Sequence, residues 1–317
     1  MKNQTGYCSS TENKIGRSGA GCGAQYLARS PLVSQSRTDE NVRQKYNVQS
    51  LTRARYLETF KVLQGLSREY QDITEFVALE MSDTVKTSFS LLDIGAGSGY
   101  LLENLVERSV CRHLSKYVAV EPDPVAAASL IQMLNGYDQI SSMVMIERYC
   151  QALAADLEQK FDVVIFCHSL YGVRDPIESL NGARKLLAKN GVLIAIVQSP
   201  MGVANLFADF DVSLNRDKPS LENFGLNGQK VADGLRSVGS DFSLFSVSSF
   251  FDVSSLFDGS AESDARRLEF LSFLLQCELA DAPRQLVADA DRRLRSLCVT
   301  KDGKVILPQA TDAFVIR

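Results

Sequence analysis

The sequence predicts an α/β fold whose β-sheet is mostly parallel and doubly wound. Between residues 88 and 197, short apolar runs alternate with segments of helical periodicity, as in sheets whose strands are joined by crossover helices. The runs are almost continuously apolar, as expected of parallel strands buried on both faces. We therefore expect a seven-stranded sheet, preceded by a helical cap and followed by a smaller lobe.

The elements of the sheet can be assigned in order along the chain. The strands are expected at 88–94, 117–121, 142–147, 161–166 and 191–197, and the helices between them at 100–109, 124–134 and 176–188. Later, residues 229–238, 262–279 and 284–297 have helical spacing. The segment 299–307 is expected to form a hairpin and 312–317 the last strand.

The cap precedes the first strand. From Arg53 to about Met81 the apolar spacing is that of two helices, and the break at "QGLS" makes Ser67 a candidate N-cap of the second helix. Residues 1–45 are rich in Ser and Gly without apolar periodicity, so we expect a flexible extension. Its basic, acid-poor composition leaves a transit peptide as an alternative.

Composition excludes several classes of function. The net charge of -4 gives no general attraction for nucleic acid, and the longest apolar runs are strand-sized, so we expect no membrane span. The seven cysteines and two histidines lack zinc-ligand spacing, so no metal is expected. Scattered thiols suit a reducing compartment, and we expect a cytoplasmic protein. The oligomeric state is not fixed by the sequence, and a monomer is compatible with it.

Three glycines lie between the first strand and its helix, in "LLDIGAGSGYLL". Gly95, Gly97 and Gly99 permit a tight turn and a close backbone approach to a ligand. The helix that follows offers free N–H groups and the positive end of its dipole. The sequence therefore predicts a small-molecule site over the carboxyl edge of the sheet.

The spacing of these glycines identifies the ligand class. The dinucleotide fingerprint is G-x-G-x-x-G, whereas G-x-G-x-G with Asp93 just ahead resembles motif I of the class I S-adenosylmethionine-dependent methyltransferases. Glu121 ends the second strand, where an acid can accept hydrogen bonds from both ribose hydroxyls. We expect a Rossmann-like domain that binds S-adenosylmethionine, with an NAD-dependent oxidoreductase as the alternative.

The fourth strand leads into "FCHSLYGVRDP". Methyltransferases that act on DNA adenine or on glutamine amides resemble one another in an Asn/Asp-Pro-Pro-Tyr motif at this position. This chain lacks that motif. The open turn instead resembles that of small-molecule methyltransferases. On this basis residues 46–317 are expected to form one methyltransferase domain, with the cap at 46–85, the cofactor-binding core at 88–200, and the substrate-side lobe and last strands at 201–317.

From about Leu51 onward the chain resembles the histamine N-methyltransferases. The matching segments are "YLETFKVLQGLSREYQDITEF", "LLDIGAGSGYLL", "VEPDP", "FDVVIFCHSLYGVRDP" and "DGKVILPQATDAFVIR". The resemblance implies N-methylation of a small amine. It also implies cofactor contacts, for which the candidates are Asp93, Gly95, Gly97, Gly99, Glu121 and Cys167.

The same resemblance supplies candidate catalytic and substrate-binding residues. The family holds its amine with a glutamate in the cap, where this chain has Glu69. The family has Gln where this chain has His168, and Asn where it has Gln309; Tyr171 keeps one of the pocket aromatics. Because a free imidazole changes its protonation near neutral pH, a histidine there is also a candidate general base.

These departures leave the acceptor open. The expected enzyme is an S-adenosylmethionine-dependent methyltransferase acting on a histamine-like or other small amine, with Glu69, His168 and Gln309 as its catalytic residues. The alternatives are a guanidine, amino-acid or hydroxyl acceptor, an NAD-dependent oxidoreductase, and a non-catalytic cofactor-binding protein.

Overall fold

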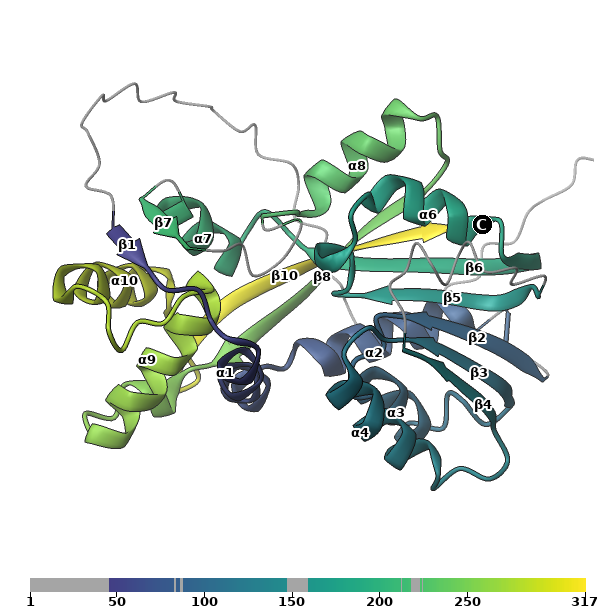
Figure 1. The fold of residues 1–317 in the computed structure, drawn as a ribbon, viewed down its shortest axis with the longest axis horizontal. Coiled ribbons are helices and arrows are strands. Elements are labelled where there is room, and N and C mark those ends of the chain that lie inside the picture. Colours follow the sequence, from purple (N-terminus) through teal and green to yellow (C-terminus); the bar gives the residue numbers. More distant parts are fainter. Residues whose placement is uncertain are drawn as a thin grey trace, which may run out of the picture. The chain divides into compact units, whose positions relative to one another are not determined.

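The fold is built around one central β-sheet with helices on its faces (Figure 1). The structure is a computed structural model, and it describes residues 46–82, 84–85, 88–146, 159–211, 213–217, 223 and 225–317. All of them fall within the unit Arg43–Arg317. The flexible extension and the transit peptide expected over residues 1–45 lie outside the described residues.

Seven strands follow one another across the sheet in the order β4-β3-β2-β5-β6-β10-β8. The first five pair in parallel: β4 (Ser141–Met145), β3 (Leu114–Val120), β2 (Phe89–Ile94), β5 (Phe161–Cys167) and β6 (Leu187–Gln198). The long β10 (Lys304–Ile316) runs antiparallel to β6 and to the edge strand β8 (Ser243–Asp252), while the short β9 (Val299–Lys301) pairs with the start of β10. The predicted α/β class and mostly parallel sheet are confirmed.

Helices cover both faces of this sheet (Figure 1). The helices α2 (Glu69–Met81), α3 (Tyr100–Glu107) and α4 (Pro124–Leu134) share one core with residues such as Leu91. The helices α6 (Pro176–Arg184) and α8 (Gly228–Ser237) share another core with Leu92, the next residue of the same strand. Successive strand side chains point to opposite faces, so each strand is buried on both sides.

A third core packs against one end of β8 and β10, with Phe251 and Leu307 among its members. It joins α1 (Arg53–Leu66), α7 (Val203–Asp211), α9 (Ala261–Leu275) and α10 (Arg284–Leu297) with the two-stranded pair β1 (Tyr46–Val48) and β7 (Leu214–Arg216). Two short 3₁₀ turns complete the chain, η1 (Leu170–Gly172) and η2 (Ser254–Leu256). Within the described residues, no helix is both long and apolar enough to cross a membrane.

Some elements differ from the sequence expectation. The strands β1, β7 and β8 and the helix α7 were not predicted, and the helix expected over 176–188 ends at Arg184. It ends there because Leu187 already pairs with Phe161 in the sheet.

The start of α2 is fixed by contacts on both sides of it. Ser67 caps the end of α1, so Arg68 rather than Ser67 is the N-cap of α2, although the Ser67 hydroxyl accepts the Glu69 N–H at 3.0 Å. The Arg68 N–H donates to the Phe250 carbonyl at 3.1 Å. The first residue of α2, Glu69, is therefore held against β8.

Candidate active site

A cavity of about 660 Å³ lies along the carboxyl ends of β2, β3 and β5. Such a volume is typical of small-molecule sites. Nine of the ten predicted site residues line it: Glu69, Asp93, Gly95, Gly97, Glu121, Cys167, His168, Tyr171 and Gln309. The topology thus brings together candidates from the cap, the sheet and the last strand.

The tenth predicted site residue, Gly99, does not line the cavity. All three glycines of the turn have positive φ angles, 77° at Gly95, 58° at Gly97 and 89° at Gly99. A Cβ atom on Gly99 would lie 2.4 Å from the Met133 Cε of α4, whereas a Cβ on Gly97 would have no neighbour within 4 Å. Gly99 therefore permits close helix packing, and Gly97 leaves open space at the cavity wall.

Glu121 holds the glycine turn. One carboxylate oxygen, Oε2, accepts the Gly97 N–H at 2.8 Å, and the other accepts the Asp123 N–H at 2.8 Å. Burial raises the pKa of Glu121, while these two backbone hydrogen bonds act in the opposite direction. Each oxygen keeps a second lone pair that faces no described donor, so the carboxylate could also accept hydroxyl groups of a ligand.

Asp93 is buried beneath the same turn. Its Oδ2 accepts the Tyr117 hydroxyl at 2.9 Å. Burial raises the pKa of Asp93 to about 7; the Tyr117 hydrogen bond opposes that shift and nearby Glu121 adds to it. The charge of Asp93 is therefore sensitive to pH near neutrality.

At the other end of the cavity, Glu69 is 6% exposed and sits among polar side chains. Its Oε1 accepts the hydroxyl of Thr311 and lies 3.5 Å from the Gln309 amide nitrogen and 3.4 Å from His168 Nε2. Within the described part of the chain, Glu69 Oε2 has no hydrogen bond or ion pair. One oxygen of Glu69 is therefore fixed by the protein, and the other has no partner among the described residues.

His168 lies directly after β5 in a strained conformation. Its φ of 50° is in the left-handed region, uncommon for a residue with a side chain. Among the described residues, Nε2 is buried without an aligned hydrogen-bond partner. It nevertheless faces Glu69 within ion-pair range, so a lone pair on Nε2 would meet the carboxylate oxygen. Nε2 is therefore the ring nitrogen best suited to carry a proton.

Tyr171 fixes the other side of this imidazole. Its ring stacks on that of His168 with an interplanar angle of 15°. Its hydroxyl accepts the Gln198 N–H at 2.6 Å and lies 3.3 Å from His168 Nδ1. Burial raises the pKa of Tyr171, so the hydroxyl keeps its proton and can donate it to Nδ1.

Burial opposes the negative charge of Glu69, but its partners outweigh that effect. Burial alone would raise its pKa; the charge of His168 and the hydrogen bonds from His168, Thr311 and Gln309 bring it below the ordinary value. Burial also raises the pKa of Cys167 well above its usual range. Glu69 is thus an anion, whereas the Cys167 thiol stays neutral and is a poor nucleophile.

The charges of the cavity are unevenly distributed. Three carboxyl side chains on its wall are buried, those of Glu69, Asp93 and Glu121. The lysines and arginine that line it, Arg53, Lys61 and Lys230, are exposed, and Arg53 pairs with Asp123 at 2.6 Å. This arrangement favours a positively charged ligand over a diphosphate. In the described part of the chain, no cluster of His, Cys, Asp and Glu could hold a metal ion.

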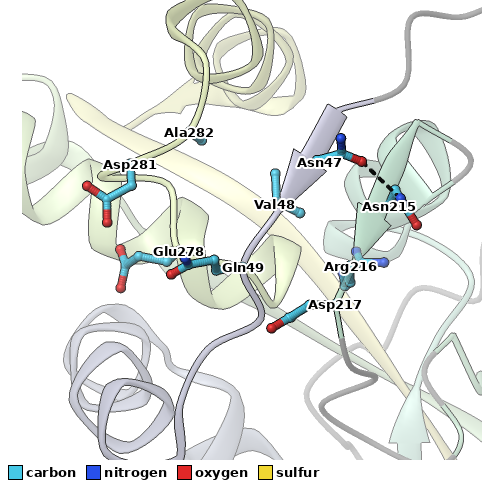
Figure 2. Close-up of a pocket in the computed structure, with 9 residues that line it drawn as sticks. All are labelled: Asn47, Val48, Gln49, Asn215, Arg216, Asp217, Glu278, Asp281 and Ala282. Atoms are coloured by element: carbon cyan, nitrogen blue, oxygen red, sulfur yellow. Dashed lines mark hydrogen bonds between the residues drawn. The ribbon is translucent and has the colours of Figure 1, made fainter.

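A second cavity, of about 480 Å³, lies beside β1 and β7 (Figure 2). Asp217, Glu278 and Asp281 are on its wall, with a hydrogen bond between Asn215 and Asn47 at 2.9 Å. The Glu278 carboxylate is already paired with Arg55 at 2.8 Å. None of the predicted site residues lines this cavity.

Sequence reasoning missed several residues in or next to the main cavity. Thr311 has no exposed surface and does not line the cavity, but its hydroxyl contacts Glu69, which does. Its position two residues after Gln309 in a strand was the available signal, since such residues share a face. Tyr70, whose ring packs edge-on against Tyr100 at 4.8 Å, lines the cavity, as do aromatic side chains of α1, β8 and α9.

Comparison with known proteins gives consistent results. The model of the methyltransferase domain family matches residues 63–223. Histamine N-methyltransferase A of Xenopus laevis is 22% identical, and histamine N-methyltransferase B of the same species 25%; each alignment covers 83% of this chain and 95% of the relative. The solved structure of the plantazolicin methyltransferase BpumL in complex with SAH is 13% identical with a TM-score of 0.44, covering 83% of this chain and 88% of that one.

The family match carries the identification, because it spans half of the chain. It includes the glycine turn, Glu121 and the His168 turn, all of which line one cavity at the carboxyl edge of the sheet. The chain therefore belongs to the methyltransferase domain family and is a class I, S-adenosylmethionine-dependent methyltransferase.

Proposed function

We propose that this enzyme transfers a methyl group to the nitrogen of a small cationic amine. One observation carries the proposal: a buried, ionised Glu69 has one oxygen held by protein groups and the other without a partner among the described residues, in the cavity that contains the glycine turn. A buried carboxylate with a free oxygen is a strong acceptor for an ammonium group. The names of the relatives, histamine N-methyltransferases, agree with such a substrate.

The cofactor end would be formed by the glycine turn and the acids beside it. The open space at Gly97 fits a ligand that approaches the backbone closely. Glu121 would accept the ribose hydroxyls, and Asp93, Gly95 and Cys167 would lie along the bound molecule. Gly99 would support this site through helix packing. S-adenosylmethionine supplies a methyl group on a positively charged sulfonium, a charge that the buried carboxyls favour.

At the acceptor end, the protein must present a nitrogen lone pair to the methyl group. An aliphatic ammonium has a pKa of about 10.4, so one proton has to leave before attack. Glu69 Oε2 would accept a hydrogen bond from the amine and orient it. Gln309 and Thr311 would fix Glu69 through Oε1, and positioning of this kind supplies much of the rate enhancement.

His168 would act beside Glu69 in this scheme. With a proton on Nε2, its imidazole stabilises the carboxylate, and the Tyr171 hydroxyl holds Nδ1. The proton that leaves the ammonium would move to Glu69 Oε2, and the Nε2–H group of His168 would still face Oε1, so Glu69 supported by His168 is the proposed base. Tyr171 would also form part of the substrate wall.

The geometry favours an amine over a guanidine. A guanidinium binds a carboxylate best through two parallel hydrogen bonds, one to each oxygen. Here Oε1 already contacts three side chains. A single available oxygen suits a single N–H donor.

Turnover of a panel of acceptors tests the proposal. The panel contains small primary amines including histamine, a guanidine such as agmatine, an amino acid, and hydroxyl compounds of matched size. Methylated products are identified by mass spectrometry with S-adenosylmethionine as donor. We expect amines to be the best acceptors and the methyl group to be on nitrogen; methylation of hydroxyl compounds alone would overturn the proposal.

We also propose that residues 46–317 are sufficient for this activity in the cytoplasm. The support is the alternation of elements after residue 46 and the free thiols of the described cysteines, Cys111, Cys167, Cys277 and Cys298. A chain lacking residues 1–45 should keep wild-type turnover. Import of the full chain into an organelle, measured by fractionation, would overturn the cytoplasmic assignment.

A further inference from the structure

The cavity continues past Glu69 along an apolar wall that the methyl-transfer chemistry does not require. We define this wall by five side chains from α1, β8 and α9: Phe60, Leu63, Phe251, Phe273 and Leu274. Leu63, Phe251 and Leu274 belong to the third core, and Phe60 and Phe273 pack against it. The wall is therefore a separate part of the cavity lining.

The wall is continuous with the acceptor end of the cavity. Phe251 forms an isolated β-bridge with Ser67, two residues before Glu69. On the other side, the Gln309 side chain accepts the N–H of Val203, whose helix α7 packs against α9. The contacts expected for the cofactor lie instead at the ends of β2 and β3. A group attached to an amine at Glu69 would thus meet the apolar wall.

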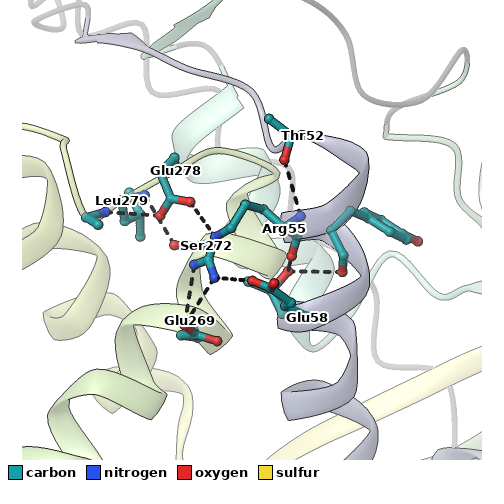
Figure 3. A network of polar contacts seen from close by, with 10 residues as sticks. Thr52, Arg55, Glu58, Glu269, Ser272, Glu278 and Leu279 are labelled. Atoms are coloured by element: carbon teal, nitrogen blue, oxygen red, sulfur yellow. Dashed lines mark hydrogen bonds and ion pairs between the residues drawn. The ribbon is translucent and has the colours of Figure 1, made fainter.

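The wall is also held in place before any ligand binds. The Phe60 and Phe273 rings lie 5.4 Å apart, and Phe251, which is 1% exposed, packs edge-on against Phe270 at 5.7 Å. Arg55 of α1 pairs with Glu269 of α9 at 3.3 Å and with Glu278, just after α9, at 2.8 Å (Figure 3). A preorganised apolar surface costs little further ordering when a ligand covers it.

The polar side chains of α1 that line the cavity are Arg53, Tyr56, Lys61 and Gln64. The side-chain amide of Gln276 donates to the Phe273 carbonyl at 2.7 Å. Exposed Lys61 lies on the rim. A purely polar acceptor would leave the half-buried rings of Phe60 and Phe273 in contact with water, whereas an apolar group would cover them.

We propose that the acceptor is an amine carrying an aromatic or branched hydrocarbon group, and that Phe60 and Phe273 determine its selection. The inference rests on the proposed amine methylation and names the substrate class of that site. The ammonium contacts Glu69 Oε2, and the hydrocarbon group lies against the apolar wall. Small amines without such a group bind through their charge alone.

Three ligands separate the contributions: 4-phenylbutylamine, butylamine, and the uncharged 4-phenylbutan-1-ol. Their affinities are measured by calorimetry on the full chain saturated with S-adenosylhomocysteine. We expect 4-phenylbutylamine to bind at least about ten-fold more tightly than butylamine, the range for an apolar group in a hydrophobic pocket. Equal affinities of the two amines would overturn the proposal without any variant.

Two variants and one control locate the effect. Phe60→Leu and Phe273→Leu should each reduce the advantage of the phenyl group by about five-fold or more and leave butylamine unchanged. Phe245→Leu, on β8 but outside the cavity and packed on Phe76 at 5.4 Å, should change neither. An equal loss in all three variants would contradict a role for the wall.

The alcohol distinguishes this inference from the proposed function. If 4-phenylbutan-1-ol binds as tightly as the amine, recognition of the charge at Glu69 fails. The dependence on Phe60 and Phe273 would then still support the apolar subsite. If the alcohol binds weakly and the phenyl group gives the amine no advantage, the proposed function stands and the subsite fails.

Discussion

The two ends of the cavity are built in different ways. The proposed cofactor end uses residues close together in the sequence, from Asp93 to Glu121, and its turn is held by the Glu121 carboxylate through backbone N–H groups. The proposed acceptor end uses the side chains of Glu69, His168 and Gln309, which are separated by up to 240 residues. The first end is fixed by a local turn, and the second depends on the packing of the whole domain.

This difference predicts where single substitutions act. Changes at the glycine turn should remove donor binding and leave the acceptor groups in place. Changes around Glu69 should weaken recognition of the acceptor and leave donor binding unchanged. The largest effect is expected at Gly97.

Gly97→Val should reduce the affinity for S-adenosylhomocysteine by at least about 100-fold. The side chain would occupy the open space beside the turn, and a β-branched residue is strained at a φ of 58°. Calorimetry measures the affinity and circular dichroism the fold. Gly65→Val is the control, since Gly65 has open space without a positive φ. Unchanged affinity in a folded Gly97 variant would remove the cofactor-site assignment.

Asp93→Asn should change how stability depends on pH. The pKa of Asp93 is about 7 in the folded protein against an ordinary 3.8, so between these values the folded state binds a proton that the unfolded state does not. The free energy of unfolding should therefore fall as the pH rises from about 4 to 7, by roughly 4 kcal/mol in total. The Asn variant should lose this contribution.

Melting temperatures between pH 4 and 8 measure the Asp93 effect. Asp138→Asn, an exposed position, serves as control and should follow the wild-type curve. A wild-type stability that is independent of Asp93 over this range would contradict the buried, protonated carboxyl.

Tyr171→Phe should have a smaller effect, confined to the acceptor end. It removes the hydroxyl between the Gln198 N–H and His168 Nδ1. Leaving a buried N–H unpaired costs about 1–3 kcal/mol of stability, and kcat/KM for the amine should fall roughly ten-fold, while donor affinity is unchanged. Tyr137→Phe, outside the cavity, is the control.

A spectroscopic measurement separates this role of Tyr171 from plain packing. The chain has only two histidines, so ¹⁵N NMR of the imidazoles can be assigned with single His→Gln variants. Wild-type His168 should carry its proton on Nε2 with Nδ1 as acceptor, and Tyr171→Phe should mix the tautomers. An unchanged tautomer in the variant would show that Tyr171 does not hold Nδ1.

The residues of the proposed cofactor end could be selected from the sequence because their signals are local. Gly95, Gly97 and Glu121 are identifiable from strand ends and spacing, and all three line the cavity. Gly99 is part of the same motif, but its packing against Met133 depends on where α4 lies. That position could not be read from a turn motif.

The acceptor end was harder to predict because strand register decides it. Thr311 has the residue type of an ordinary strand position, and only the pairing of β10 with β6 and β8 brings it beneath Glu69. The strand β8 itself was missed because its Ser-rich, partly exposed sequence lacks a continuous apolar run, and its partner is more than fifty residues away. The apolar wall, which includes Phe251 of β8, was missed with it.

The central claim is that Glu69 recognises a positive charge next to an independent donor site. Glu69→Gln tests it most directly, because the change keeps the shape and removes only the charge. The measurement compares kcat/KM for the best amine acceptor with the affinity for S-adenosylhomocysteine. Glu75→Gln is the control, on the same helix but at the surface, paired with Arg108 at 2.8 Å.

We predict that Glu69→Gln lowers kcat/KM for the amine on the order of 100-fold, as for truncation of a buried charge partner, and leaves donor affinity within about two-fold. Any activity toward an uncharged hydroxyl acceptor should change little. Amine turnover equal to that of the Glu75→Gln control would contradict the claim. A matching loss of donor affinity would contradict the separation of the two ends.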